Sequence, residues 1–389
     1  MIQAKIVADS INIQGDRLTT LEVVMPRYIL AEFNTHRMLS KNSASSRAIP
    51  FSKMVKEVEE RPFIPYAWQL NHKGMQGTEY LENSHLIEEA TRLWLKARDN
   101  AVMSATLLNG SVGGKAVTKQ LVNRLLEPFM YHKVLVSATE FENFFNLRCP
   151  SYEWEYEEGT IKAKSKEEFL NMFLKRYPTN GEKDLIDELG LVDEDLQPIN
   201  ILAWLNLNKG QADIHMMFLA EAIYDAIKES TPRELKDGEW HIPYGDNMNI
   251  QTLNNYLINT DLGKTDSIET LQCKISIARC ARLSYQTLGD NPVIDYEKDL
   301  ALYESLSTSG HWSPFEHVAK AMTEEEHNSY VKGNFTSLFD FGKTPEAYNF
   351  KNALLYKIFD AGVDQRFWAN KKEELEKELS DLNSKAPTV

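Results

Sequence analysis

Hydrophobic positions recur at helical spacing along most of this chain and follow a strand-like run in only one place. Residues 84–108 show the helical pattern most clearly, because apolar side chains return every three or four positions and Asn109-Gly110 ends the run. The shared face consists of Leu86, Ile87, Ala90, Leu93, Trp94, Ala97 and Ala101. The pattern therefore predicts a long amphipathic helix, whereas residues 18–24 (LTTLEVV) predict a strand.

The same spacing predicts further helices, and no regular alternation of strands and helices is present. They cover residues 28–37, 115–127, 132–148, 211–228, 267–282, 295–307 and 344–361. The last has Thr344 as N-cap, Pro345 at its first position and Gly362 after its end. Residues 230–266 are turn-rich, and residues 371–385 read as a solvated helix or a fraying end. A helix-rich α+β chain is expected.

Residues 149–210 differ in composition from the sequence around them. They are rich in Glu and Lys, contain Pro150, Pro178 and Pro198, and include the acidic run VDEDLQP. This composition predicts an inserted acidic surface element. We therefore divide the chain into residues 1–148, the insert at 149–210, and a helical part at 211–389.

Composition narrows the possible partners. The chain has 389 residues, 42% of them hydrophobic, and its formal net charge is -14. Such a charge opposes binding to nucleic acid or an anionic membrane, but a small anion needs only a few local cations. Three cysteines without a Cys-x-x-Cys pair favour neither a disulfide framework nor a zinc site. With no signal pattern or membrane-length apolar run, a cytoplasmic protein is expected.

The first group of candidate residues lies at 34–47. It holds His36, Arg37 and Arg47 among hydroxyl and amide side chains, with small residues at 43–46. Arginine presents a planar fork that fits phosphate oxygens, and small residues let backbone N–H groups approach an anion. The segment is typical of a phosphate-binding loop, although a Ser-rich surface turn with solvated arginines is an equal alternative.

Two further segments carry polar groups in unusual settings. In Glu142–Arg148, Asn143, Asn146 and Arg148 stand among apolar side chains, which suits recognition of a heterocycle edge or simply a helix end. GHWSPFEH at 310–317 holds two His and a Glu, but Pro314 breaks the helical spacing that a metal site would use, so no metal is expected. Cys149 beside Arg148 is more typical of a packing residue than of a nucleophile.

Together these segments resemble the flavin-dependent thymidylate synthases. The family signature is Arg-His-Arg, seven residues, Ser, and closely afterwards Arg; here Thr35-His36-Arg37 is followed by Met38–Ala44, Ser45 and Arg47. GHWSPFEH, ARLSY at 281–285 and NFFNLR at 143–148 are similar to three further family blocks, and Arg124 with Pro128 resembles a fourth. Residues 211–215 are only weakly similar to a fifth family block.

The order of the blocks is rotated. ARLSY and GHWSPFEH precede the arginine motif in the family but lie near the C-terminus here, so the chain resembles a circularly permuted member. The resemblance implies a helix-rich α+β fold with a small antiparallel sheet. It also implies a homotetramer that uses FAD, methylenetetrahydrofolate and NADPH to methylate dUMP at C5.

The resemblance also implies that residues 1–148 form the nucleotide- and flavin-binding part and that the helical part at 211–389 completes the same catalytic domain. It further implies residue roles. Arg148 would be the catalytic group that stabilises negative charge on the pyrimidine. The nucleotide would contact Glu32, Ser45, Ser46, Arg47, Arg124 and Ser284. The flavin would contact His36, Arg37, Asn42, Ser43, Asn143, His311 and Ser313.

Several positions depart from the family pattern. Thr35 replaces an arginine, Glu32 stands where the family has Gln, and Ser43 where it has Glu; Ser137 and Thr139 replace Asn and Arg on an expected flavin-facing helix. A carboxylate near the base would favour a ring with an amino group. Two alternatives therefore remain: a methylase or hydroxymethylase acting on dCMP or dUMP, and a nucleotide-binding protein without turnover.

Overall fold

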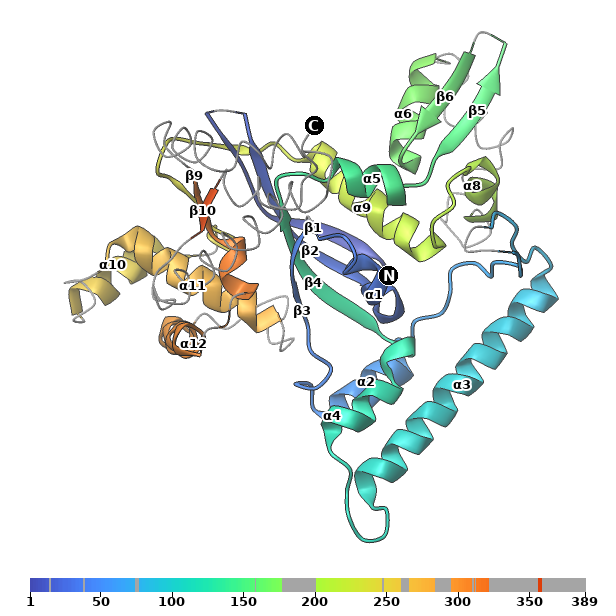
Figure 1. Cartoon of the computed structure of the whole chain (residues 1–389), viewed down its shortest axis with the longest axis horizontal. Helices are drawn as coiled ribbons and strands as arrows, with labels where there is room; N and C mark the ends of the chain where they lie inside the picture. The colour runs from blue at the N-terminus through green and yellow to red at the C-terminus, as the bar shows by residue number, and fades with distance from the viewer. Residues whose placement is uncertain are drawn as a thin grey trace, which may run out of the picture. The chain divides into compact units, whose positions relative to one another are not determined.

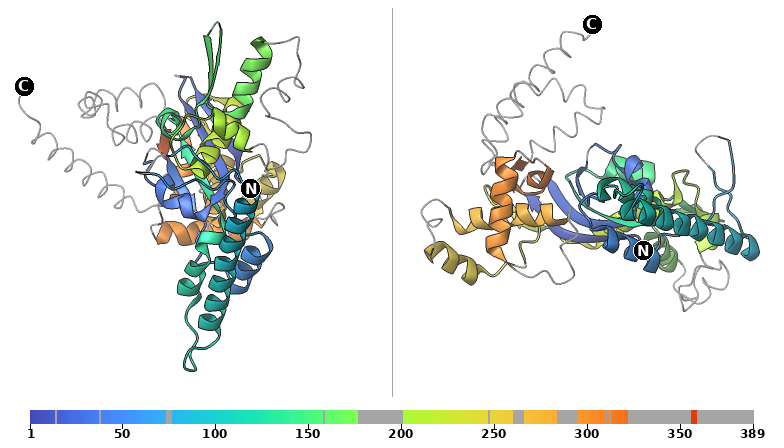
Figure 2. Two further views of the ribbon diagram at one scale, coloured as in Figure 1. Left: turned by 90° about the vertical axis from the view of Figure 1, so that its right-hand side faces the viewer. Right: turned by 90° about the horizontal axis from the view of Figure 1, so that it is seen from below.

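The chain is helix-rich and α+β, and its described residues form two compact units (Figures 1 and 2). The computed structural model describes residues 1–13, 15–37, 39–73, 77–157, 159–176, 201–246, 248–259, 266–283, 295–309, 311, 313–321 and 356–358. The first unit comprises Met1–Asp9, Arg17–Pro232 and Ser284–Gln286. The second comprises Ser10–Asp16, Arg233–Leu283 and Thr287–Val389. No helix among the described residues is long and apolar enough to span a membrane.

A five-stranded sheet organises the first unit, in the order β3-β4-β2-β1-β7. Its strands are β1 (Gln3–Asn12), β2 (Arg17–Pro26), β3 (Ser40–Ser43), β4 (Tyr131–Ala138) and β7 (Arg233–Leu235). β4 pairs antiparallel with both β2 and β3. Ser10–Asn12 at the end of β1 pair parallel with β7, and both of these segments belong to the second unit. The strand predicted at 18–24 is confirmed, but the sheet is mixed rather than antiparallel.

The helix predicted at 132–148 is wrong over its first half. Strand β4 occupies that part, and only α5 (Glu142–Arg148) is helical. Val134, Leu135 and Val136 are all fully buried in the middle of the sheet. A short run that is buried on both faces shows no alternation, so its periodicity cannot be told from that of a helix, and β-branched valines favour the strand.

Helices on the sheet complete the main core of the first unit. The segment η1 (Arg27–Ile29) leads into α1 (Leu30–Phe33), which ends earlier than the 28–37 prediction, and α9 (Ile214–Glu229) confirms the helix predicted at 211–228. The shared core includes Leu21, Val23, Phe33, Val134, Val136, Phe144, Leu219 and Ile223. This packing fixes α1, α5 and α9 on the same scaffold (Figure 1).

A helical layer in the same unit contains the long helix α3 (Ser84–Gly110), which confirms the prediction for 84–108 (Figure 2). It packs with α2 (Phe51–Glu60), α4 (Lys119–Val122), η2 (Asn123–Leu125) and η3 (Glu127–Phe129). The single helix predicted at 115–127 is therefore wrong, because the chain makes three short pieces there. Leu86 and Leu93 of the expected apolar face are 49% and 51% exposed.

Residues of the acidic insert fold around a small core of their own. The hairpin β5 (Tyr152–Tyr156) and β6 (Gly159–Ala163) packs with α6 (Lys166–Arg176) and α8 (Ile201–Leu207). Its core is Tyr152, Ile161, Ala163, Phe169, Phe173 and Trp204. The backbone N–H of Lys166 donates to Glu221 Oε1 at 2.6 Å, and the Lys166 ammonium forms an ion pair with the same carboxylate on α9.

The second unit confirms two helices and corrects two expectations. Helices α11 (Ile268–Arg282) and α12 (Tyr296–Thr308) match the predictions for 267–282 and 295–307. Helix α10 (Ile250–Asn259) lies in the stretch expected to consist of turns. The remaining elements are β8 (Trp240–His241), η7 (Ser313–His317), β9 (Ala319–Ala321) and β10 (Tyr356–Ile358), with sheet order β10-β9-β8.

Strand β10 contradicts the helix predicted at 344–361 over 356–358, the part of it that the structure describes. Thr344, Pro345 and Gly362, together with the tail at 371–385, lie outside the described residues.

Candidate functional site

Arg148 meets two residues that the sequence analysis placed in the same site. It is the last residue of α5, and its Nε–H donates to His36 Nε2 at 2.9 Å. Its Nη1 forms an ion pair with Glu32 Oε1, and both side chains remain partly exposed, at 22% and 33%. The separation along the chain is 112 residues to His36 and 116 to Glu32, so the fold joins two of the sequence blocks here.

Local packing holds this cluster in place. Helix α1 carries Glu32, and the N–H of His36 donates to the carbonyl of Phe33 at 3.2 Å just after that helix ends. The ring of Phe144 on α5 meets His36 edge-on, with centroids 4.9 Å apart. Lys41 donates to the carbonyl oxygen of His36 at 2.5 Å, which fixes the backbone of the loop.

His36 is neutral in this arrangement. Burial lowers its pKa to about 4, and the positive charges of Arg148 and Lys41 add to the effect. Because the Arg148 guanidinium can only donate, His36 Nε2 must accept, and the ring proton lies on Nδ1. The imidazole therefore orients Arg148 without adding a second positive charge.

A second cluster joins the turn at 45–47 to the segment that carries Arg124. The hydroxyl of Ser46 donates to Glu127 Oε1 at 2.5 Å, and Asn123 Nδ2 donates to the carbonyl oxygens of Ser46 and Ile49 at 2.7 and 3.0 Å. Ser46 and Asn123 are buried, whereas Arg47 and Arg124 are exposed. The buried bonds thus connect two turns that each present an arginine to solvent.

The remaining site predictions in the first unit fall on β3, the loops around it and α5. Asn42 is buried on β3 opposite Leu135, and Ser43 is half-buried opposite Val134. Ser45 is also half-buried, while Arg37 and Asn143 are exposed.

The flavin-facing helix that was expected to carry Ser137 and Thr139 is absent from this part of the first unit. Ser137 lies on strand β4, where its hydroxyl is 2.6 Å from that of Thr20 on β2, and Thr139 follows the strand. The expected helix is therefore wrong, because the buried valine run forms a strand.

His311 and Ser313 belong to the second unit. His311 is exposed, and its Nδ1 is 2.8 Å from the Ser309 hydroxyl; Ser313 begins η7. Ser284 lies outside the described residues. Across the described part of the chain, no three His, Cys, Asp or Glu side chains gather as metal ligands would.

Cys149 is buried behind Arg148. Burial raises the pKa of its thiol far above the usual value, so the thiolate needed by a nucleophile is disfavoured. This agrees with the interpretation of Cys149 as a packing residue.

Sequence reasoning missed a polar cluster around the start of α9. Asp213 caps that helix, and the Tyr28 hydroxyl donates to Asp213 Oδ1 at 3.0 Å and lies 2.5 Å from His215 Nδ1. The N–H of Tyr66 donates to His215 Nε2 at 3.0 Å. An Asp directly before a helical run is a capping signal, but nothing in the sequence connects it to Tyr28.

Comparisons with known proteins give weak structural similarity and no match in sequence. No protein-family model and no curated protein matches the chain. Two crystal structures of PolB, a UMP/dUMP methylase from Streptomyces cacaoi, bound with 5-Br UMP and 5-Br dUMP, are 15% and 12% identical to it. They cover 54% of this chain and 96% and 97% of their own. The TM-score is 0.31 for both, which does not establish a common fold.

Proposed function

We propose that the chain is a flavin-dependent methyltransferase of the thymidylate synthase type, which transfers a one-carbon unit from methylenetetrahydrofolate to C5 of dUMP. The observation that carries the proposal is the contact of Arg148 with Glu32 and His36. These residues come from parts of the sequence more than a hundred positions apart that resemble the same family. Chance matches to the family motifs would not be expected to come into contact in the fold.

Arg148 has the chemistry that C5 alkylation of a pyrimidine needs. Negative charge develops on the ring when C5 acts as the nucleophile, and a fixed cation lowers the energy of that state. Arginine has five N–H donors, and Glu32 and His36 engage two of them among the described residues. The other three can face a ring carbonyl while the neutral imidazole keeps the guanidinium oriented.

The turn at 45–47 suits the phosphate of the nucleotide. Arg47 and Arg124 are exposed, and neither forms an ion pair with any described residue, so both can bind an anion. The buried hydrogen bonds that join Ser46 to Asn123 and Glu127 would hold the turn that carries Arg47 near η2, which carries Arg124. Such anchoring fixes the orientation of the base relative to Arg148.

The donor groups of the first unit suit a flavin. Arg37 directly follows the neutral His36, and Asn143 is exposed on the helix that carries Arg148. Cationic and amide donors match the diphosphate and the ring carbonyls of FAD. When bound, FAD would carry hydride from NADPH; the residues of this chain would bind it and exclude water from the reacting ring.

A second substrate is favoured by one observation. The carboxylate of Glu32 pairs with Arg148, so the two could act together on a base. A carboxylate accepts hydrogen bonds, which suits the exocyclic amino group of cytosine rather than a carbonyl. A methylated or hydroxymethylated dCMP is therefore the alternative product.

The experiment begins with the colour of the purified protein. A yellow protein is incubated with methylenetetrahydrofolate, NADPH and either dUMP or dCMP, and the nucleotide mass is measured. A gain of one methyl on dUMP is the expected result, and methylated or hydroxymethylated dCMP selects the alternative. Nucleotide binding by a protein that stays colourless with added FAD would instead favour a nucleotide-binding protein without turnover.

A further inference from the structure

Helix α5 has a second side, away from His36, that borders a cavity of about 340 Å³. Phe144 and Arg148 of this helix contact His36, whereas Phe141, just before it, and Phe145 line the cavity. The full lining is Arg17, Thr19, Ala138, Thr139, Phe141, Glu142, Phe145, Lys164, Tyr224, Ile227 and Lys228. All of these residues belong to the first unit.

The floor of this cavity is apolar and well packed. The rings of Phe141 and Phe145 are stacked, with centroids 5.8 Å apart and planes 20° from parallel. Tyr224 meets Phe145 edge-on at 5.2 Å. Because neighbouring rings support one another, this floor gives a ligand a rigid apolar surface.

The rim carries two lysines without a carboxylate partner. Lys164 Nζ donates to the amide oxygen of Asn146 at 2.6 Å, and Lys228 Nζ lies 5.2 Å from the centre of the Tyr224 ring. Neither forms an ion pair with any residue that the structure describes. In a chain with 57 acidic and 43 basic residues, this is a local excess of positive charge.

The other charged groups of the lining leave that excess in place. Arg17 is compensated, because its Nε and Nη2 donate to Asp9 at 2.9 and 2.6 Å and its Nη2 also reaches the carbonyl oxygen of Ile227. Glu142 supplies the single carboxylate of the lining. The backbone of Lys164 is also fixed, since its N–H donates to Glu168 Oε2 at 2.8 Å.

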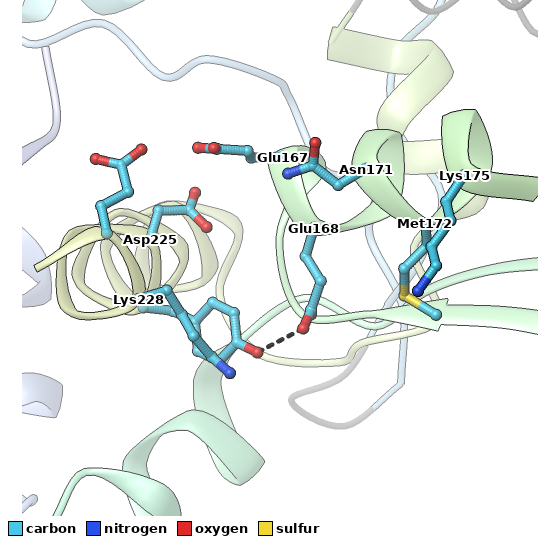
Figure 3. A pocket seen from close by; sticks show the side chains of 9 residues that line it. Glu167, Glu168, Asn171, Met172, Lys175, Asp225 and Lys228 are labelled. Atoms are coloured by element: carbon cyan, nitrogen blue, oxygen red, sulfur yellow. Dashed lines mark hydrogen bonds between the residues drawn. The ribbon is translucent and has the colours of Figure 1, made fainter. Parts of the chain in front are cut away.

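A neighbouring cavity between α6 and α9 has the opposite character (Figure 3). It measures about 290 Å³ and is lined by four carboxylates, those of Glu167, Glu168, Asp225 and Glu229. Tyr224 and Lys228 line both cavities. Burial, with the nearby Glu221 and Glu167, raises the pKa of Asp225 to about 6. With four carboxylates against two lysines, this cavity favours an anion less than the cavity beside α5 does.

We propose that the cavity beside α5 binds a small organic anion, a carboxylate or phosphate held by Lys164 and Lys228, with its apolar part on Phe141 and Phe145. Each lysine would contribute to the affinity through a partly solvated ion pair between its ammonium group and the bound anion. The inference concerns a site across α5 from Arg148 and does not depend on the proposed function.

The test is titration calorimetry of the full chain at low salt with three probes: p-aminobenzoylglutamate, dUMP and inorganic phosphate. Lys164→Gln and Lys228→Gln should each weaken binding of the organic probe about three- to tenfold. Glu142→Gln should tighten it, because the carboxylate of the lining is lost. Added NaCl should weaken binding to the wild-type protein.

Lys175→Gln is the matched control, since Lys175 lines the acidic cavity of Figure 3 and the cavity beside α5 does not include it. It should leave the affinity unchanged. A preference for p-aminobenzoylglutamate or for dUMP identifies the source of the anion. The proposal is overturned if no organic probe binds, if the Lys164 and Glu142 variants bind like wild type, or if inorganic phosphate binds equally well.

Discussion

Arg148 has two unlike neighbours: the oppositely charged carboxylate of Glu32 and the neutral imidazole of His36. The ion pair with Glu32 stabilises the guanidinium, while His36 fixes its direction through a single Nε–H bond. Such an arrangement keeps a cation oriented beside a loop that is otherwise rich in donors. The consequences can be tested one side chain at a time.

Replacing Arg148 by Ala should abolish methylation and leave FAD bound. Loss of the cation removes stabilisation of charge on the pyrimidine, which costs about 100- to 1000-fold in kcat. The measurement is the nucleotide product formed per minute, with flavin absorbance of the purified variant as the control for folding. Turnover at the wild-type rate would remove Arg148 from its catalytic role.

The titration of His36 should depend on Arg148. By NMR, the His36 ring should titrate with a pKa of about 4, and Arg148→Gln should raise that value because one cause of the shift is removed. Between pH 6.5 and about 4 the unfolded state binds more protons than the folded state. The free energy of unfolding should therefore fall as the pH is lowered through this window.

His36→Asn provides the comparison for that pH effect. His132 and His317 also have pKa values lowered to about 3, and they act in the same direction. The contribution of His36 is therefore the difference between wild type and variant in the pH dependence of the free energy of unfolding. Equal pH dependence in the two proteins would contradict the prediction.

The family resemblance pointed to Glu32, His36 and Arg148, and the structure brings these three residues into contact. The sequence could not identify Asn123 or Glu127, whose roles come from buried bonds to Ser46 across about eighty residues. Nothing in local spacing specifies such partners. Candidate binding residues can therefore be proposed from the sequence, whereas the residues that position them are found only in the fold.

At the scale of elements, both the confirmed helices and the errors have physical causes. Helices α3, α9, α11 and α12 were predicted because each has an apolar stripe and a clear end. Strand β4 was missed because burial on both faces erases alternation. Helix α10 was missed because it has ten residues, of which only Leu253 is buried, so its apolar stripe is weak.

The docking of α6 on α9 depends on Glu221. Its side chain is 7% exposed and binds both the backbone N–H and the ammonium of Lys166. Glu221→Ala should lower the free energy of unfolding by about 2 to 4 kcal/mol, because the variant leaves the Lys166 charge without its partner. Urea unfolding followed by tryptophan fluorescence measures the change.

Lys162→Gln is the control for that experiment, since the Lys162–Glu153 pair is largely exposed. It should change stability by less than about 1 kcal/mol. If the Glu221 variant is no less stable than this control, the ion pair does not hold the insert in place.

On the scale of the whole molecule, α3 leaves an apolar stripe exposed. Of its 27 residues only Ala105 is buried, and the exposed stripe contains Leu86, Leu93, Met103 and Leu107. At 100° per residue these four lie within an arc of roughly 100°. A stripe of this kind marks an interaction surface.

The homotetramer expected from the family resemblance would use such a surface. Wild-type protein should elute as an oligomer, and Leu93→Glu with Leu107→Glu should shift it to smaller species, because charge opposes burial of the stripe. Light scattering coupled to size exclusion measures the masses. A wild-type protein that is monomeric at micromolar concentration would rule out assembly through α3.

The buried thiol of Cys149 can report on local opening of the chain next to Arg148. All three cysteines are buried, and Cys149 directly follows Arg148 at the end of α5, whereas Cys273 and Cys280 belong to α11. Alkylation by iodoacetamide therefore requires local opening of the surrounding helix. If a nucleotide binds at Arg148, the rate of Cys149 alkylation should fall. The alkylation rates of Cys273 and Cys280 on α11 should stay the same and serve as the internal reference.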